Sequence, residues 1–381
     1  MIPGLFENLW DTALLGYISF RTAMAGLTGL VLALALGGPT IAWLKRHRVG
    51  EDVTKTDSIA LADLSQRMGK QDTPTMGGSF LVASLLISTL LWARLDNVHV
   101  VMGLILTAGL AAVGFVDDFK KLTVPHSKGL SAKSKLAGQT VITVFTVGAM
   151  VWYARDRGLW DLLSIWPPFF KDLSFSLGES YLGLGVFVLF GWLVVAGTSN
   201  AVNITDGMDG LAAGLMVISC LALSVMCYIT GRPDYTFHLH LPHVQDASEM
   251  AVVGGAVCGS CMGFLWFNAF PAKVFMGDSG SLPLGGLLGW MALIAKQELV
   301  LPLIGFVFFA ELGSSALQTK WYRLSGGKRL FTMAPVHHGL QLKGGVFRPG
   351  TAPWHEVTVV VRFWIIAAAC AIASLALMKV R

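Results

Sequence analysis

The sequence predicts an all-α polytopic membrane protein with about ten transmembrane helices. Of its 381 residues, 54% are hydrophobic and 13% are charged, whereas a soluble domain carries about 25% charged residues. The charged residues arrive in bursts, separated by apolar runs long enough to cross a bilayer, which takes about 20 residues. The 43 glycines and 14 prolines also fit membrane helices, which tolerate both residue types better than soluble helices do.

Ten apolar stretches follow one another along the chain as candidate membrane spans. Their approximate bounds are 20–44, 77–94, 98–116, 134–153, 180–198, 208–230, 249–265, 280–295, 298–320 and 356–378. Because ten is an even number, both termini are expected on one side of the membrane. We also expect residues 1–381 to form a single integral membrane domain, because the spans follow one another along the whole chain.

The distribution of Lys and Arg predicts the orientation of the spans. The loops after the odd-numbered spans hold 18 of these residues, counting Lys320 at a helix end, whereas the opposite side holds eight. Cytoplasmic loops are enriched in Lys and Arg, so we expect the odd-numbered loops inside the cell and both termini outside. The net charge of +5 is concentrated on one side of the membrane. This asymmetry is better explained by membrane orientation and binding of anionic substrates than by nucleic-acid binding.

The same loops also hold unusual acidic residues, beginning with the pair Asp117 and Asp118 at the end of the third span. Two adjacent carboxylates repel each other unless a cation joins them. The alternative is a solvated helix end neutralised by Lys120 and Lys121, where each ion pair is worth only about 0.3–0.5 kcal/mol. This pair alone does not decide between the two interpretations.

A second acidic pair, Asp206 and Asp209, opens the sixth span. Three residues apart on a helix, the two carboxylates share a face, and about 6 Å apart they repel by roughly 3 kcal/mol at an effective dielectric of about 20. A divalent metal or a lysine would relieve that repulsion. Thr205 or Asp206 could instead cap the helix, while Gly207 and Gly210 would allow the close approach of a nucleotide.

A single carboxylate, Asp278, lies between Gly277 and Gly280 just before the eighth span. A carboxylate at the edge of a membrane is expensive unless it binds something, so Asp278 is a candidate ligand. The nearby Phe275 could stack on a nucleobase, although packing is the commoner fate of a lone aromatic side chain.

Two further features bring positive or titratable groups to the same side. His337 and His338 form a pair in the long basic loop after the ninth span, where they suit phosphate contact or proton transfer; a solvent-facing polar pair is the alternative. Lys70 and Thr75 precede the glycines that open the second span, and helix N-termini attract phosphate. Lys133 and Lys135 add charge at the start of the fourth span.

Together these features predict one site at the cytoplasmic ends of several spans. Hard oxygen ligands favour Mg²⁺, which usually bridges carboxylates to substrate phosphates. A transporter would need ionisable residues near the middle of its spans, and a non-catalytic scaffold would not need five carboxylates in loops. The sequence contains no GxxxxGK[ST] motif, which excludes a P-loop pump.

The motifs, in this order, resemble the polyprenyl-phosphate N-acetylhexosamine-1-phosphate transferases, and most closely their muramoyl-pentapeptide branch. The resembling stretches cover nearly the whole chain: Pro74-Thr-Met-Gly-Gly78, Asp117-Asp-Phe-Lys120, Asn203-Ile-Thr-Asp206-Gly-Met-Asp209-Gly-Leu211, Pro271-Ala-Lys-Val-Phe-Met-Gly-Asp278, Met333-Ala-Pro-Val-His-His338 and Val361-Arg-Phe-Trp-Ile-Ile366.

This resemblance implies a Mg²⁺-dependent enzyme of the bacterial inner membrane, usually a homodimer. It would transfer phospho-MurNAc-pentapeptide from UDP-MurNAc-pentapeptide to undecaprenyl phosphate, a membrane lipid, to give lipid I and UMP. A GlcNAc-1-phosphate transferase that uses UDP-GlcNAc and the same lipid acceptor is the alternative.

The resemblance also implies roles for individual residues. Asp278 would bind the metal, and Asp117, with Asp118 beside it, would be the base or the lipid-phosphate contact. The uridine pocket would comprise Lys70, Asp206, Gly207, Asp209, Asn268 and Phe275, and the phosphates would be handled by Asn203, Lys121, Lys133, His337 and His338. Thr75 and Ser281 complete the expected substrate-binding residues. Gly339 stands where the family commonly has a third consecutive histidine, so no role is assigned to it.

Overall fold

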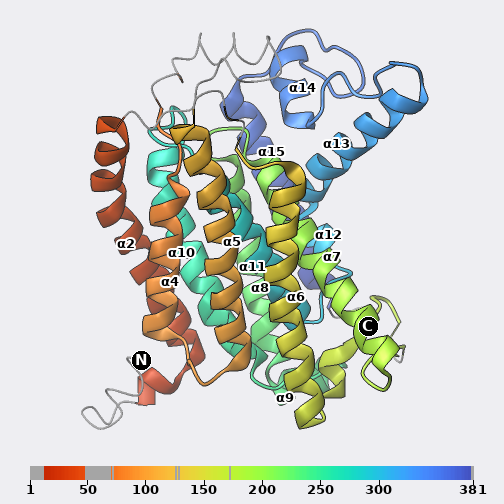
Figure 1. The fold of residues 1–381 in the computed structure, drawn as a ribbon. Helices are drawn as coiled ribbons and strands as arrows, with labels where there is room; N and C mark the ends of the chain where they lie inside the picture. Colours follow the sequence, from red (N-terminus) through yellow and green to blue (C-terminus); the bar gives the residue numbers. More distant parts are fainter. Residues whose placement is uncertain are drawn as a thin grey trace.

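The computed structural model describes residues 13–47, 70, 73–124, 127, 129–170 and 173–378. They form a helical bundle with one two-stranded sheet, in which Ser164 pairs with Ser176 and Ile165 pairs with Phe175 (Figure 1). The elements are η1 Ala13–Gly16, α2 Ile18–Arg46, α4 Gly78–Trp92, α5 Val98–Thr123, α6 Ala132–Arg157, η4 Trp160–Leu163, β1 Ser164–Ile165, β2 Phe175–Ser176, α7 Tyr181–Thr205, α8 Leu211–Thr230, α9 Pro233–Leu239, η5 Ala247–Glu249, α10 Met250–Asn268, α11 Asp278–Ile294, α12 Leu301–Ile304, α13 Phe306–Leu324, α14 Val336–Lys343 and α15 Glu356–Leu377.

Each of the ten predicted spans coincides with a helix, except that the ninth is divided at Gly305 into α12 and α13. Within the part of the chain that the structure describes, seven helices are long and apolar enough to cross a membrane: α2, α5, α6, α7, α8, α10 extended by η5, and α15. The shorter α4 has 15 residues and α11 has 17. The polytopic all-α fold is confirmed, whereas the number of ten crossings and the orientation stay predictions.

Helix α11 forms the centre of the bundle. All of its residues from Asp278 to Ile294 are buried, and it packs against α4, α5, α7 and α8. A helix that is apolar on all sides is expected to be enclosed by other helices. The first turn of α11, which begins with Asp278, therefore lies among the ends of its neighbours.

Two glycines let neighbouring backbones approach this first turn. A Cβ atom at Gly114 of α5 would overlap the backbone carbonyl of Asp278, and one at Gly78 of α4 would overlap the backbone of Gly280. The segment before α4 also pairs with the segment before α11, because Gly77 N donates to Phe275 O at 2.8 Å and Gly78 N donates to Met276 O at 2.8 Å. Close backbone packing thus fixes the start of α11 against α4 and α5.

The two ends of the bundle carry different polar clusters. At one end, Arg21 near the start of α2 forms a buried ion pair with Glu249, which also accepts a hydrogen bond from Arg94 N at 2.8 Å. The start of α15, at Glu356, lies at the other end beside Lys70. The start of α2 and the end of α15 therefore lie toward the same end of the bundle, opposite α14 (Figure 1).

We predict that Gly114→Ala destabilises the protein even though Ala favours a helix over Gly by about 1 kcal/mol. The added methyl group would push α5 away from the Asp278 carbonyl, and such overpacking costs about 1–3 kcal/mol. Thermal denaturation in detergent should give a lower midpoint for Gly114→Ala. The control is Gly148→Ala in α6, where a Cβ atom has no neighbour within 4 Å. Equal midpoints for both variants would contradict this packing.

Candidate active site

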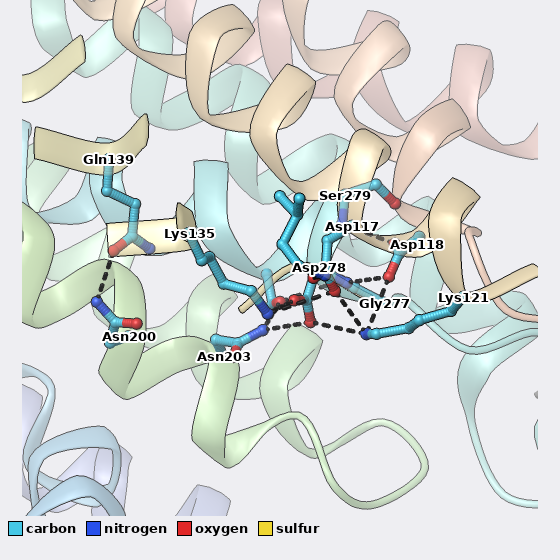
Figure 2. A network of polar contacts seen from close by, with 12 residues as sticks. Asp117, Asp118, Lys121, Lys135, Gln139, Asn200, Asn203, Gly277, Asp278 and Ser279 are labelled. Atoms are coloured by element: carbon cyan, nitrogen blue, oxygen red, sulfur yellow. Dashed lines mark hydrogen bonds and ion pairs between the residues drawn. The ribbon is translucent and has the colours of Figure 1, made fainter. Parts of the chain in front are cut away.

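Three carboxylates from two helices meet at the start of α11. Asp117 and Asp118 lie near the end of α5, and Asp278 is the first residue of α11. Each offers an oxygen atom within 4.8 Å of the others, and Figure 2 shows the three side chains converging. Among the described residues they form the one such group of His, Cys, Asp or Glu. We call Asp117, Asp118 and Asp278 the carboxylate cluster.

Asp118 joins the cluster to the backbone of α11. Its Oδ1 accepts a hydrogen bond from Asp278 N at 3.3 Å, and its Oδ2 accepts one from Ser279 N at 2.9 Å. The first N–H groups of a helix have no partner within it and carry the positive end of the helix dipole. Asp118 therefore caps α11 from a different helix, which fixes the distance between α5 and Asp278.

Two lysines lie against the carboxylate cluster. Lys121 Nζ lies 2.7 Å from Asp117 Oδ2 and 3.5 Å from Asp118 Oδ1. Lys135 Nζ lies 3.3 Å from Asp117 Oδ2 and forms an ion pair with Asp278 (Figure 2). Three carboxylates and two ammonium groups leave the group one negative charge in excess. Such a group can accept a further cation or, through its lysines, an anionic oxygen.

Asn203 and Ser281 extend the cluster toward α7. Asn203 Nδ2 lies 2.7 Å from Asp278 Oδ1 and 2.8 Å from Ser281 Oγ, while Ser281 Oγ donates to Gly277 O at 3.0 Å. Both residues were predicted to contact substrate, and the structure brings both to the predicted metal ligand. Thr75 is buried on another side, where a Cβ atom at Gly277 would lie 3.1 Å from Thr75 Oγ1.

A second polar group, which we call the lysine pocket, contains Lys70, Asp209 and Glu356. Lys70 Nζ lies 2.7 Å from Asp209 Oδ1 and 2.8 and 2.9 Å from the two carboxylate oxygens of Glu356. The other oxygen of Asp209 accepts a hydrogen bond from Ala272 N at 3.0 Å. Lys70 therefore neutralises Asp209. The geometry predicted for the acidic pair is wrong, because Asp206 is the C-cap residue of α7 and α8 begins only at Leu211, so the two carboxylates do not share a helix face.

Asn268 and Phe275 border the lysine pocket. Asn268 Oδ1 accepts from Gly210 N at 3.0 Å, and its amide donates to Val274 O at 2.9 Å, which ties the start of α8 to the loop before α11. The partly exposed ring of Phe275 lies 6.0 Å from Lys70 Nζ. Since residues 268–278 link Asn268 to Asp278, the lysine pocket and the carboxylate cluster are connected by one short segment.

The predicted histidines lie on α14, where His337 is fully buried. Its Nδ1 lies 3.2 Å from Glu311 Oε2 of α13, and its ring centroid lies 4.1 Å from that of His338. A Cβ atom at Gly207 would lie 2.6 Å from His337 Nε2, so the absence of a side chain at Gly207 leaves room for the His337 ring beside the loop after α7. The solvent-facing interpretation of the pair is wrong for His337.

Lys133 is exposed on the first turn of α6, and the contacts with the carboxylate cluster come from Lys135. The role predicted for Lys133 therefore stays a prediction.

Asp206, predicted for the uridine pocket, is the C-cap residue of α7. From the sequence, Lys135 was predicted only to add positive charge beside Lys133, and Glu356 and Glu311 were not predicted as site residues. The position of Glu356, an acid at the start of the last apolar span, could have identified it as a candidate. No feature of the sequence indicates that Lys135, rather than Lys133, faces the cluster.

An apolar groove of about 580 Å³ runs between the end of α7 and α13. It begins at Ile204, next to Asn203, and Leu312 and Ala316 form part of its wall. Lys320 and Arg323 line the same groove. The groove therefore offers apolar surface and two cations, and one of its lining residues, Ile204, is the neighbour in sequence of Asn203.

The fold and the site define a polytopic membrane protein with a buried acidic centre, flanked by lysines, at one end of its helices. Residues 100–296 match the family described as glycosyl transferase family 4, and the chain belongs to this family.

Curated relatives narrow the identification to one kind of transferase. The phospho-N-acetylmuramoyl-pentapeptide-transferase of Desulfovibrio desulfuricans is 40% identical over 365 residues, covering 96% of this chain and 94% of the relative. The protein of that name from Desulfosudis oleivorans is 41% identical over 365 residues, with the same coverage. That of Maricaulis maris is 40% identical over 387 residues and covers 100% of both chains. Within glycosyl transferase family 4, the chain groups with the phospho-N-acetylmuramoyl-pentapeptide transferases.

We predict that His338 makes the stability of the protein depend on pH. Burial, together with the neighbouring His337, lowers the pKa of His338 from 6.5 to about 3. Below pH 6.5 the unfolded chain therefore binds a proton that the folded chain does not, and stability falls toward pH 3, by about 2 kcal/mol at pH 5. The apparent melting temperature of His338→Gln should fall less between about pH 7 and pH 5 than that of the parent protein. An equal fall in both proteins would contradict a depressed pKa.

Proposed function

We propose that this chain transfers phospho-MurNAc-pentapeptide from UDP-MurNAc-pentapeptide to undecaprenyl phosphate, giving lipid I and UMP. The observation that carries the proposal is the carboxylate cluster with Lys121 and Lys135 against it at one end of the helices. Relatives that share about 40% of their residues with the whole chain are named for this transferase activity. The alternative, a GlcNAc-1-phosphate transferase, is not favoured by those relatives.

The carboxylate cluster fits a Mg²⁺ ion. Its donors are hard oxygen atoms from three carboxylates within 4.8 Å of one another, and its charge is negative even with both lysines counted. Asp278 would hold the ion, with Asp117 and Asp118 beside it. When bound, Mg²⁺ supplies charge neutralisation at phosphate oxygens.

The side chains of the cluster support phosphoryl transfer. Lys121 and Lys135 bind and neutralise phosphate oxygens. The phosphate of the lipid attacks the β-phosphate of the sugar nucleotide, a new P–O bond forms, and the bond to the α-phosphate breaks as UMP leaves. The transfer needs mainly positioning and charge stabilisation. Because a phosphate monoester is largely ionised near neutral pH, Asp117 acts chiefly by orienting Lys121 and Lys135 rather than as a strong base.

The lysine pocket is the proposed uridine site. Phe275 offers a partly exposed aromatic ring beside Lys70. Asp209 and Asn268 border the pocket, where Asp209 holds Lys70 and Asn268 ties the start of α8 to the loop before α11. The loop from Asn268 to Asp278 would then hold the nucleoside at one end and the reacting phosphates at the other. His337 and His338, next to Gly207, would border the same site.

The groove between α7 and α13 is the proposed seat of the polyprenyl chain. Its apolar wall suits a hydrocarbon, and Lys320 and Arg323 suit the adjacent phosphate. The proposal includes a location in the bacterial inner membrane, with the site facing the cytoplasm as the 18 to eight distribution of Lys and Arg indicates. It also includes a homodimer, as the family resemblance implies.

Purified protein with Mg²⁺ and undecaprenyl phosphate should release UMP from UDP-MurNAc-pentapeptide and not from UDP-GlcNAc. Omitting the lipid is the control, because UMP release should then cease. UMP release from UDP-GlcNAc alone would overturn the proposed sugar, and release from neither donor would overturn the proposed activity.

A further inference from the structure

Glu356 is a buried carboxylate, and no role for it follows from the transfer reaction described above. It is the first residue of α15 and is 1% exposed. Burial of a charged carboxylate is costly unless ion pairs and hydrogen bonds compensate it. The hydrogen-bond and ion-pair partners of Glu356 therefore indicate the role of its buried charge.

These partners come from three separate segments of the chain. Lys70 Nζ lies 2.8 Å from Oε1 and 2.9 Å from Oε2 of Glu356. Asp209 N, in the loop before α8, donates to Oε1 at 2.8 Å. Gln341 Nε2 of α14 donates to Oε2 at 3.2 Å. One carboxylate thus fixes the positions of Lys70, the loop before α8 and the helix that carries the two histidines.

Glu356 also changes the charge of the lysine pocket. Lys70 contacts two buried carboxylates, those of Asp209 and Glu356, so the pocket carries one negative charge in excess rather than none. A phosphate group would be repelled there, whereas an uncharged ring with hydrogen-bonding edges would not. The ammonium group of Lys70 also lies 6.0 Å from the ring centroids of both Phe270 and Phe275, close to the surface on which a flat ring could stack.

We propose that Glu356 is a positioning residue for nucleobase recognition. It holds Lys70 beside Phe275 and gives the pocket the charge that admits an uncharged base and excludes phosphate. The phosphates of a nucleotide are thereby directed toward Lys121 and Lys135, at the other end of the segment that leads to Asp278. The identity of the base as uracil rests on the proposed function, whereas the positioning of Lys70 does not.

The test compares the parent protein with Glu356→Gln, which keeps the shape of the side chain but removes its charge. Equilibrium binding of uridine should weaken about tenfold or more. In the turnover assay, the KM for UDP-MurNAc-pentapeptide should rise about tenfold, while kcat and the KM for undecaprenyl phosphate stay within about threefold. Glu179→Gln, at an exposed position before α7, is the matched control and should change none of these values.

A Lys70→Ala background separates positioning from a merely structural role. If Glu356 acts through Lys70, Glu356→Gln should change uridine affinity less than about twofold in that background. An equal loss in both backgrounds, unchanged uridine affinity in Glu356→Gln, or a parent protein that does not bind uridine would each overturn the proposal. Uridine binding requires no turnover. Absence of turnover in the parent protein would therefore refute the proposed function alone.

Discussion

The buried start of α11 is the constraint on which the remaining structure depends. Its first turn lies among α4, α5 and α7, and it can do so because Gly78 and Gly114 have no side chains. The N–H groups exposed by that turn are taken up by Asp118 of α5. Helix packing and helix capping therefore place Asp278 beside Asp117, and the carboxylate cluster is a consequence of both.

The two parts of the site differ in what their charged groups can bind. In the carboxylate cluster, Lys121 and Lys135 remain partly exposed and near the acids, so they can also bind anionic oxygen atoms. In the lysine pocket, Lys70 is held by Asp209 and Glu356. Both groups are negative by one charge, yet the first offers oxygen ligands to a cation, whereas the second uses its acids to hold a lysine. A nucleotide has a matching division between its phosphates and its base.

The positions of the helices were predictable because hydropathy alone separates the apolar runs, and nine of the ten predicted spans coincide with one helix each. The number of crossings was harder to predict. Helix α11 has 17 residues that are all buried in the bundle. Its apolar composition is therefore explained by packing against other helices and does not by itself indicate a membrane crossing. The ninth span is divided at Gly305, whose backbone leaves the helical conformation (φ -100°, ψ 34°), and apolar composition does not record such a break.

The site was predictable where acids stood out against an apolar sequence, as with Asp117 and Asp278. It was less predictable where the choice among similar residues depends on the rotation of a helix. Lys133 and Lys135 are two positions apart, which places them on different faces, and the structure brings Lys135 to the cluster. Glu356 and Glu311 were missed because their partners, Lys70 and His337, are distant in sequence.

The most direct test of this account is equilibrium binding of Mn²⁺, a spectroscopic substitute for Mg²⁺, measured by electron paramagnetic resonance. If the start of α11 creates the metal site, the parent protein should bind one ion, and Asp278→Asn should bind it about tenfold more weakly or worse. Asp234→Asn, in the exposed α9 segment, should bind it like the parent protein. Equal affinity in the parent protein and Asp278→Asn would contradict the central role assigned to the carboxylate cluster.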